Sequence, residues 1–250
     1  VISAIFPLVS VAQYVPTRGD GWSHRVPGEV GMNPAGVQAA VEYAMSHETS
    51  VERDQELSQT QSFGREPLGH GIGPFKVRGG AAGMIVRHGY IVAEWGDTKR
   101  VDMTHSVTKS FLSTVVGLAW DEGLIGSLDD TVREYMAPTN VPEGDGEPGV
   151  DRSGFGRPDP TTMFESLHNR TITWDDLLRQ TSDWEGTLWG KPDWADRPDR
   201  DSRTWGARDR HPSGTVYEYN DTRVNILALA ATNVWRRALP EVLQERVMGP

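Results

Sequence analysis

The chain has 250 residues, 37% of them hydrophobic, which suffices to bury a core in one large or two small domains. Its formal net charge is -10, so it offers no basic surface to neutralise phosphates, and nucleic acid is not an expected partner. The absence of cysteine excludes disulfides, thiolate metal ligands and cysteine nucleophiles. A small-molecule substrate fits this composition best.

The N-terminal stretch, Val1 to Gln13, is apolar or uncharged and too short to span a bilayer. It has two interpretations, the end of a secretory leader or a buried strand. The first predicts a periplasmic or secreted protein, and a cytoplasmic protein is the alternative. No stable membrane span is expected.

The first predicted helix follows this lead-in. Asn33 and Pro34 are suited to the N-cap and first position of a helix, and apolar residues continue at helical spacing to Ala44. We expect this helix to pack on a sheet. The polar, glycine-rich stretch 46–80 has no clear period and is predicted to be a loop or an insertion.

A β-hairpin is predicted by two short apolar runs, 83–87 and 90–95, which His88 and Gly89 separate. The pattern then becomes helical. Over 106–122 the apolar residues cover much of a helix circumference, so this helix is expected to be central and largely buried.

The second half of the chain is predicted to be mainly helical and loop. The acidic segment 138–160 lacks the spacing of a calcium loop and is interpreted as a solvated loop, and no metal site is expected. Thr173 and Asp176 match a capping box, which predicts the start of a helix. Further helices are predicted at 128–136, 222–237 and 239–247.

Ser106 and Lys109 are three positions apart at the start of the central predicted helix, a spacing that places both side chains on one face. A serine hydroxyl is a poor nucleophile until a neighbour takes its proton, and a lysine does so only if its pKa is lowered. A helix N-terminus supplies positive potential and N–H groups for a developing oxyanion. The pattern predicts a nucleophile and its proton acceptor; the alternative is an ordinary helix start with a polar cap.

Three runs carry a resemblance to a known group of proteins, namely Thr104 to Phe111, Gly123 to Val132 and Gly214 to Asn225. They resemble the serine beta-lactamase and penicillin-binding protein superfamily, in particular class C beta-lactamases, esterases and D-alanyl-D-alanine carboxypeptidases. The resemblance implies an α/β fold of the α+β type, with an antiparallel sheet, flanking helices and a helical region. It also implies an acyl-enzyme on Ser106, no cofactor and a small acyl substrate.

In the third run, Tyr219 matches the motif tyrosine of this superfamily and Asp221 its motif asparagine. The resemblance implies that Tyr219 belongs to the general base and protonates the leaving group. A competing register pairs Tyr217 with Tyr219 and makes Asn220 the polar partner. An ionised Asp221 accepts but does not donate hydrogen bonds, which favours an ester or amide other than a penicillin.

Trp184 and Trp189 are expected either to form an aromatic wall for the acyl group or to pack their own loop. The third motif of the superfamily, Lys-Thr-Gly or His-x-Gly, does not occur after Tyr219, so the C-terminal strands are expected to be missing from this chain. We interpret residues 1–33 as a lead-in and 34–250 as a partial serine hydrolase domain. A non-turnover penicillin-recognising sensor, or a truncated inactive homologue, is the alternative.

Overall fold

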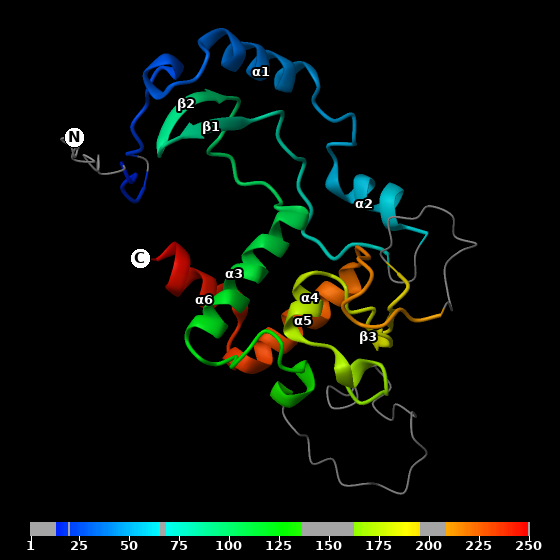
Figure 1. The fold of residues 1–250 in the computed structure, drawn as a ribbon. Coiled ribbons are helices and arrows are strands. Elements are labelled where there is room, and N and C mark those ends of the chain that lie inside the picture. The colour runs from blue at the N-terminus through cyan, green and yellow to red at the C-terminus, as the bar shows by residue number, and fades with distance from the viewer. Residues whose placement is uncertain (1–13, 20, 66–68, 137–162, 196–208, 250) are drawn as a thin grey trace, which may run out of the picture. The chain divides into compact units, whose positions relative to one another are not determined.

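The computed structural model describes residues 14–19, 21–65, 69–136, 163–195 and 209–249, drawn in colour in Figure 1. The chain divides into two compact units. The hairpin unit comprises Val1–Ser58 and Ile72–Met103, and the helical unit comprises Gln59–Gly71 and Thr104–Pro250. The possible leader at 1–13 and the acidic segment 138–160 lie outside the described residues.

The hairpin unit is built on one antiparallel pair of strands, β1 (Gly83–Arg87) and β2 (Tyr90–Trp95). The turn residues His88 and Gly89 have φ values of 53° and 86°. A two-residue turn with positive φ at both positions matches the right-handed twist of the two strands. Glycine suits such a turn because it adopts positive φ without steric cost. The predicted hairpin is confirmed, with one irregularity in the pairing between Ile85 and Val86.

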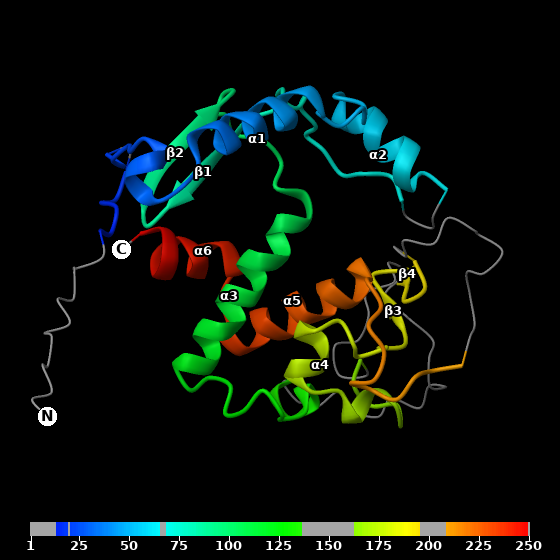
Figure 2. The same cartoon turned by 45° about the horizontal axis from the view of Figure 1, so that its top comes forward.

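Helix α1 (Pro34–Ser46) runs alongside the hairpin and contacts β2 (Figures 1 and 2). Its start is the predicted one: the Asn33 side chain accepts a hydrogen bond from the Gly36 N–H at 3.0 Å, and Pro34 is the first helical residue. The small apolar core of this unit contains Val37, Ile91 and Val92.

Helix α2 (Gln55–Phe63) was not predicted, because its residues are mostly polar and show no apolar stripe. Its start is stabilised by the Asp54 side chain, which accepts hydrogen bonds from the N–H groups of Glu56 and Leu57 at 3.0 and 3.1 Å. The division between the two units falls within α2, between Ser58 and Gln59.

The helical unit is centred on α3 (Thr108–Asp121) and α5 (Asp221–Trp235), which contact each other. Helix α4 (Trp174–Leu178) packs on α5, and α6 (Leu239–Leu243) contacts both α3 and α5, as Figures 1 and 2 show. A π-helical turn, Gln244–Met248, continues α6. The predicted central helix is confirmed, and it contributes Leu112, Val115, Val116 and Ala119 to the buried residues.

The start of α4 confirms the predicted capping box. Thr173 Oγ1 accepts from the Asp176 N–H at 3.2 Å, and Asp176 Oδ2 accepts from the Thr173 N–H at 3.0 Å. The predicted helix at 128–136 is wrong, since only Val132–Tyr135 forms a short 3₁₀ turn. The reason lies in backbone pairing: the Val132 N–H donates to the Ile172 carbonyl at 3.0 Å, and Thr131 and Thr173 form a bridge.

The remaining short elements are the strands β3 (Thr187–Leu188) and β4 (Lys191–Pro192) and the 3₁₀ turns Pro27–Val30, His105–Val107 and Asn169–Thr171. β3 and β4 form a second antiparallel pair. Helices combined with small antiparallel sheets place the described residues in the expected α/β class of the α+β type.

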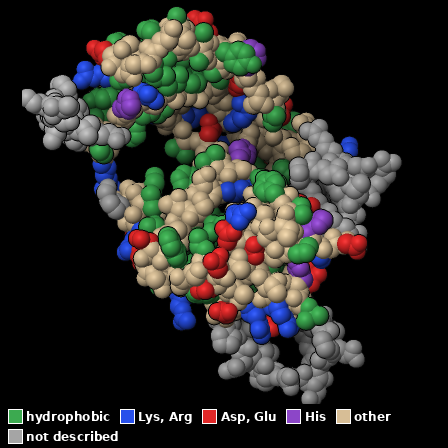
Figure 3. Space-filling model, viewed as in Figure 1, with side chains coloured by type: hydrophobic (Ala, Val, Ile, Leu, Met, Phe, Trp, Pro, Cys, Tyr) green, Lys and Arg blue, Asp and Glu red, His purple; other side chains and the backbone are tan. Residues whose placement is uncertain are grey.

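The surface of the helical unit, in the lower half of Figure 3, carries acidic and basic side chains side by side. Exposed ion pairs of this unit include Arg179–Asp175 and Arg133–Glu165. Among the helices that the structure describes, none has the length and apolar character needed to cross a membrane.

Candidate active site

Ser106 and Lys109 lie at the junction of two helical elements. Ser106 is in the 3₁₀ turn His105–Val107, and Lys109 is in the first turn of α3. The turn places the two side chains on one face, and Lys109 Nζ donates to Ser106 Oγ at 3.0 Å. His105, at φ 45°, begins this turn with a left-handed backbone conformation.

Tyr219 and Asp221 are brought to this point by the N-terminus of α5. The Asn220 side chain caps the helix by accepting from the Arg223 N–H at 3.0 Å, so Tyr219 is the last residue before the cap and Asp221 the first of the helix. Ser106 Oγ lies 2.5 Å from Tyr219 Oη. The Lys109 ammonium also lies 4.8 Å from the centre of the Tyr219 ring.

The competing register does not fit this geometry. Tyr217 is exposed, while the buried Asn220 amide donates to the carbonyls of Asp193 and Ala195 at 2.7 and 2.9 Å. Asn220 is thereby committed to the local fold. The structure brings Tyr219, and not Tyr217, to Ser106.

An ion pair completes the cluster, since Lys109 Nζ lies 2.6 Å from Asp221 Oδ1. Partial burial of Lys109 lowers its pKa, but hydrogen bonds to Asp221 and Tyr219, together with the Asp221 charge, outweigh this and leave the pKa raised above the ordinary lysine value. Lys109 is therefore an ammonium ion at neutral pH.

The hydrogen-bond directions follow from that charge. An ammonium only donates, so Ser106 Oγ accepts from Lys109, whereas either hydroxyl can donate in the contact of Ser106 with Tyr219. As an ammonium, Lys109 has no electron pair with which to take the serine proton, so its predicted role requires the neutral form. The carboxylate in place of the motif asparagine keeps Lys109 charged.

A cavity of about 790 Å³ within the helical unit adjoins this cluster. Ser106, Lys109 and Asp221 are part of its wall. Its other lining residues are Gln59, Phe63, Thr104, His105, Thr108, Phe111, Leu112, Val115, Lys191, Val224, Asn225, Ala228, Leu239, Pro240 and Leu243.

The two tryptophans expected near the substrate do not line this cavity. Trp184 is buried in the core and its indole N–H donates to the Met163 carbonyl at 2.7 Å, so it is a packing residue and the expected substrate contact is corrected. Trp189 is 58% exposed, at a position with φ 51° between β3 and β4. The structure therefore favours loop packing for Trp184.

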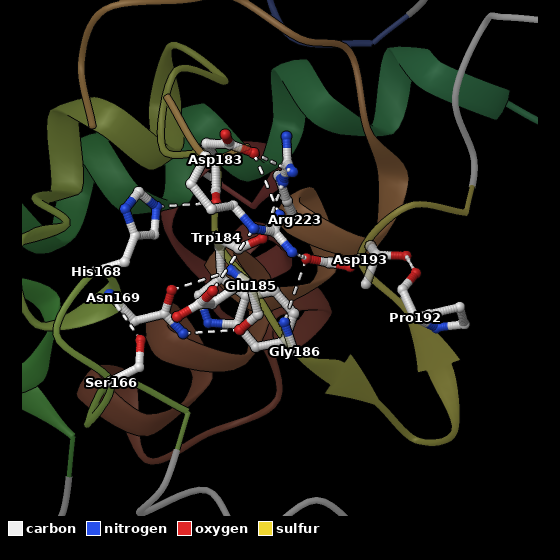
Figure 4. Close-up of polar contacts among 12 residues, drawn as sticks. Ser166, His168, Asn169, Asp183, Trp184, Glu185, Gly186, Pro192, Asp193 and Arg223 are labelled. Carbon is white, nitrogen blue, oxygen red and sulfur yellow. Dashed lines mark hydrogen bonds and ion pairs between the residues drawn. The ribbon is translucent and has the colours of Figure 1, made fainter. Parts of the chain in front are cut away.

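A buried charged network lies beside the site, and Figure 4 shows its central residues. Arg223 of α5 donates to Asp183 Oδ1 at 2.6 Å, to Glu218 Oε2 at 2.5 Å and to the Trp184 carbonyl at 3.2 Å. Arg210 pairs with Asp183 and, closely, with Asp193. These bonds tie α5 to the turn 180–184.

The same turn holds the backbone on both sides of Tyr219. The Gln180 carbonyl accepts from the Glu218 N–H at 3.0 Å, and Gln180 Oε1 accepts from the Asn220 N–H at 3.1 Å. His168 Nε2 lies 3.2 and 3.0 Å from the carbonyl oxygens of Ser182 and Asp183 (Figure 4). Because carbonyl oxygens only accept, Nε2 must carry a proton that it donates to them.

Sequence reasoning missed this support. Asp183 adopts φ 46°. Positive φ is uncommon for a residue other than glycine, and it persists where several contacts hold the residue in place. Here the bonds to Arg223 and Arg210 do so, but the sequence does not show which arginine reaches Asp183.

Within the described part of the chain, no three His, Asp or Glu side chains are grouped as a metal ion would require. The charged side chains near Ser106 instead pair with one another.

Comparison with known families assigns the chain to a class. A serine beside a lysine and a tyrosine, in a unit built mainly of helices, is the arrangement to compare with known families. The Beta-lactamase family model matches residues 72–250, and the chain belongs to that family. A search of curated proteins finds no match.

Proposed function

We propose that this protein is a serine acyl hydrolase that works through an acyl-enzyme on Ser106, with a small ester, amide or peptide-like compound as substrate. The observation that carries the proposal is the contact of Ser106 Oγ with Lys109 Nζ at 3.0 Å and with Tyr219 Oη at 2.5 Å. Membership of the Beta-lactamase family supports it.

In the acylation step, Tyr219 acts as the phenolate: Ser106 Oγ attacks the substrate carbonyl carbon while its proton passes to the Tyr219 oxygen, which becomes a neutral hydroxyl. A bond forms between Oγ and carbon, and the carbonyl oxygen becomes an oxyanion near the positive N-terminal end of α3. When the intermediate collapses, the bond to the leaving group breaks and Tyr219 returns the proton to the leaving atom. Lys109 remains an ammonium and stabilises negative charge on the tyrosine oxygen.

In the deacylation step, water attacks the acyl carbon and gives its proton to Tyr219. The ester bond to Ser106 breaks, the carboxylic acid leaves, and Oγ regains a proton. Asp221 keeps Lys109 charged and in place throughout. The sensor alternative differs in this step alone, because its acyl-enzyme would persist.

The proposal is tested by the intact mass of the protein before and after exposure to p-nitrophenyl acetate and to a penicillin. We expect a gain of one acyl group in the native protein and none in Ser106→Ala. Ser110→Ala is the matched control, because Ser110 is an exposed serine of α3 with no part in the cluster.

Each outcome decides between the candidates. An adduct that forms only with Ser106 and decays within the assay supports a hydrolase, whereas a lasting adduct supports a sensor. If a protein with a cooperative unfolding transition gains no mass from either reagent, it is not an acyl hydrolase.

A further inference from the structure

The residues that line the cavity beside Ser106 indicate which kind of substrate would bind there. We propose that it is an acyl-chain site, so that the substrate is an ester or amide of a long apolar carboxylic acid. This inference rests on the proposed acyl hydrolase function. It adds which part of the substrate the protein selects and where that part binds.

The first argument is the order of residues along α3. Phe111, Leu112 and Val115 line the same cavity as Ser106 and Lys109. Their spacing along α3 places them on the side of the helix that faces the cavity, beyond Ser106 and Lys109. An acyl group attached to Ser106 therefore has an apolar helix surface leading away from its carbonyl carbon.

The second argument is the opposite wall. Val224 and Ala228 from α5, and Leu239 and Leu243 from α6, add to the apolar part of the lining. Three helices thus contribute apolar residues to an open cavity of about 790 Å³, within the range of volumes of small-molecule sites. Methylene groups that pack on this apolar part of the wall are removed from water, which is favourable.

The third argument decides which half of the substrate occupies the cavity. Tyr219 contacts Ser106 Oγ but is not one of the residues that line the cavity. The group that protonates the leaving atom must be within hydrogen-bond reach of it. The leaving group therefore lies on the Tyr219 side of Ser106, and the cavity is left for the acyl side.

The test uses two series of esters with the full 250-residue protein. In the first, the leaving group is always p-nitrophenol and the acyl group grows from acetyl through hexanoyl to decanoyl. In the second, acetate is constant and the alcohol grows from ethyl to octyl. We expect kcat/KM to rise by about fourfold per added methylene in the acyl series until the cavity is full, and to stay nearly flat in the alcohol series.

Variants then locate the effect. Ala228→Phe fills part of the cavity and should lower the ratio of kcat/KM for octanoate to that for acetate by about tenfold. Ala39→Phe, the same change at an exposed position of α1 in the other unit, should leave the ratio unchanged. Should Ala228→Phe fail to fold, Leu243→Ala widens the cavity and should move the optimum to longer chains.

The outcomes separate this inference from the proposed function. Ser106-dependent hydrolysis of acetate with no dependence on acyl length, or with a preference that follows the alcohol instead, overturns the acyl-chain site and leaves the hydrolase intact. A length preference that Ala228→Phe and Leu243→Ala do not alter also overturns it. Absence of any Ser106-dependent turnover removes both.

Discussion

Two ion pairs on the first turn of α5 have the same length and different surroundings. Asp221 lies 2.6 Å from Lys109, and these side chains are 35% and 23% exposed. Arg223 lies 2.6 Å from Asp183, and these are 2% and 3% exposed. One pair adjoins the cavity beside Ser106, and the other is enclosed by protein.

The difference shows how one helix end serves two purposes. A buried ion pair is stable only if its remaining donors and acceptors are satisfied, and Arg223 has such partners in Glu218 and the Trp184 carbonyl. That pair fixes the position of α5. The accessible pair is partly exposed to solvent and lies beside Ser106 and Tyr219.

The largest effect is expected from breaking the buried pair. Arg223→Met leaves Asp183 buried without its closest cation and should lower the free energy of unfolding by about 3 kcal/mol. Urea denaturation at constant m-value measures this change.

Arg179→Met is the matched control, because Arg179 forms an exposed ion pair with Asp175 one turn away. It should cost less than about 0.5 kcal/mol. Equal costs for the two variants would show that the buried pair has no special role in stability.

The second prediction concerns the accessible cluster. Tyr219→Phe removes the proposed proton acceptor of Ser106 and should slow acylation by a factor of about 10² to 10⁴ while the unfolding transition stays close to that of the native protein. Stopped-flow release of p-nitrophenol measures the step. Tyr217→Phe, two positions earlier and exposed, should leave the rate unchanged, and the reverse pattern would restore the competing register.

The third prediction sharpens the role of the accessible pair. Asp221→Asn removes the charge that raises the pKa of Lys109 and leaves only a neutral amide oxygen as acceptor, while the partial burial that lowers the pKa remains, so the pKa falls. The native lysine keeps its proton to higher pH than in the unfolded chain. Its contribution is complete below the ordinary lysine pKa and is lost as pH rises through the folded value.

If Lys109 must be an ammonium, the alkaline limb of the acylation profile moves to lower pH in Asp221→Asn. If instead neutral Lys109 is the proton acceptor, the same variant gains activity as the pH rises from neutrality. The pH profile of acylation by p-nitrophenyl acetate thus decides which group takes the serine proton. Asp175→Asn, at an exposed pair, is the control and should not shift the profile.

The sequence alone predicts those structural features whose interacting residues are close together in the chain. The hairpin turn at His88 and Gly89, the cap at Asn33 and the capping box at Thr173 were predicted, because each depends on neighbours within a few residues. The 3₁₀ turn at Val132 was mistaken for a helix, since its backbone pairs with Ile172, far away along the chain.

The candidate site follows the same rule. Ser106 and Lys109 were predicted from their spacing, and Tyr219 from a motif. The partnership of Arg223 with Asp183 joins positions 40 residues apart and has no local signature. The charge state of Lys109 also escaped prediction, because it depends on which carboxylate lies beside it in space.

The smallest effects are expected from the two tryptophans, which contrast an enclosed and an exposed side chain. Trp184→Phe loses the hydrogen bond to the Met163 carbonyl, but the Asn169 amide still donates to that oxygen, so we expect a cost of about 1 kcal/mol in the free energy of unfolding. Trp189→Phe should change it by less than about 0.5 kcal/mol. Both should keep the native ratio of octanoate to acetate hydrolysis. A changed ratio in Trp189→Phe alone would instead mean that its loop reaches the substrate, and would return Trp189 to the binding site.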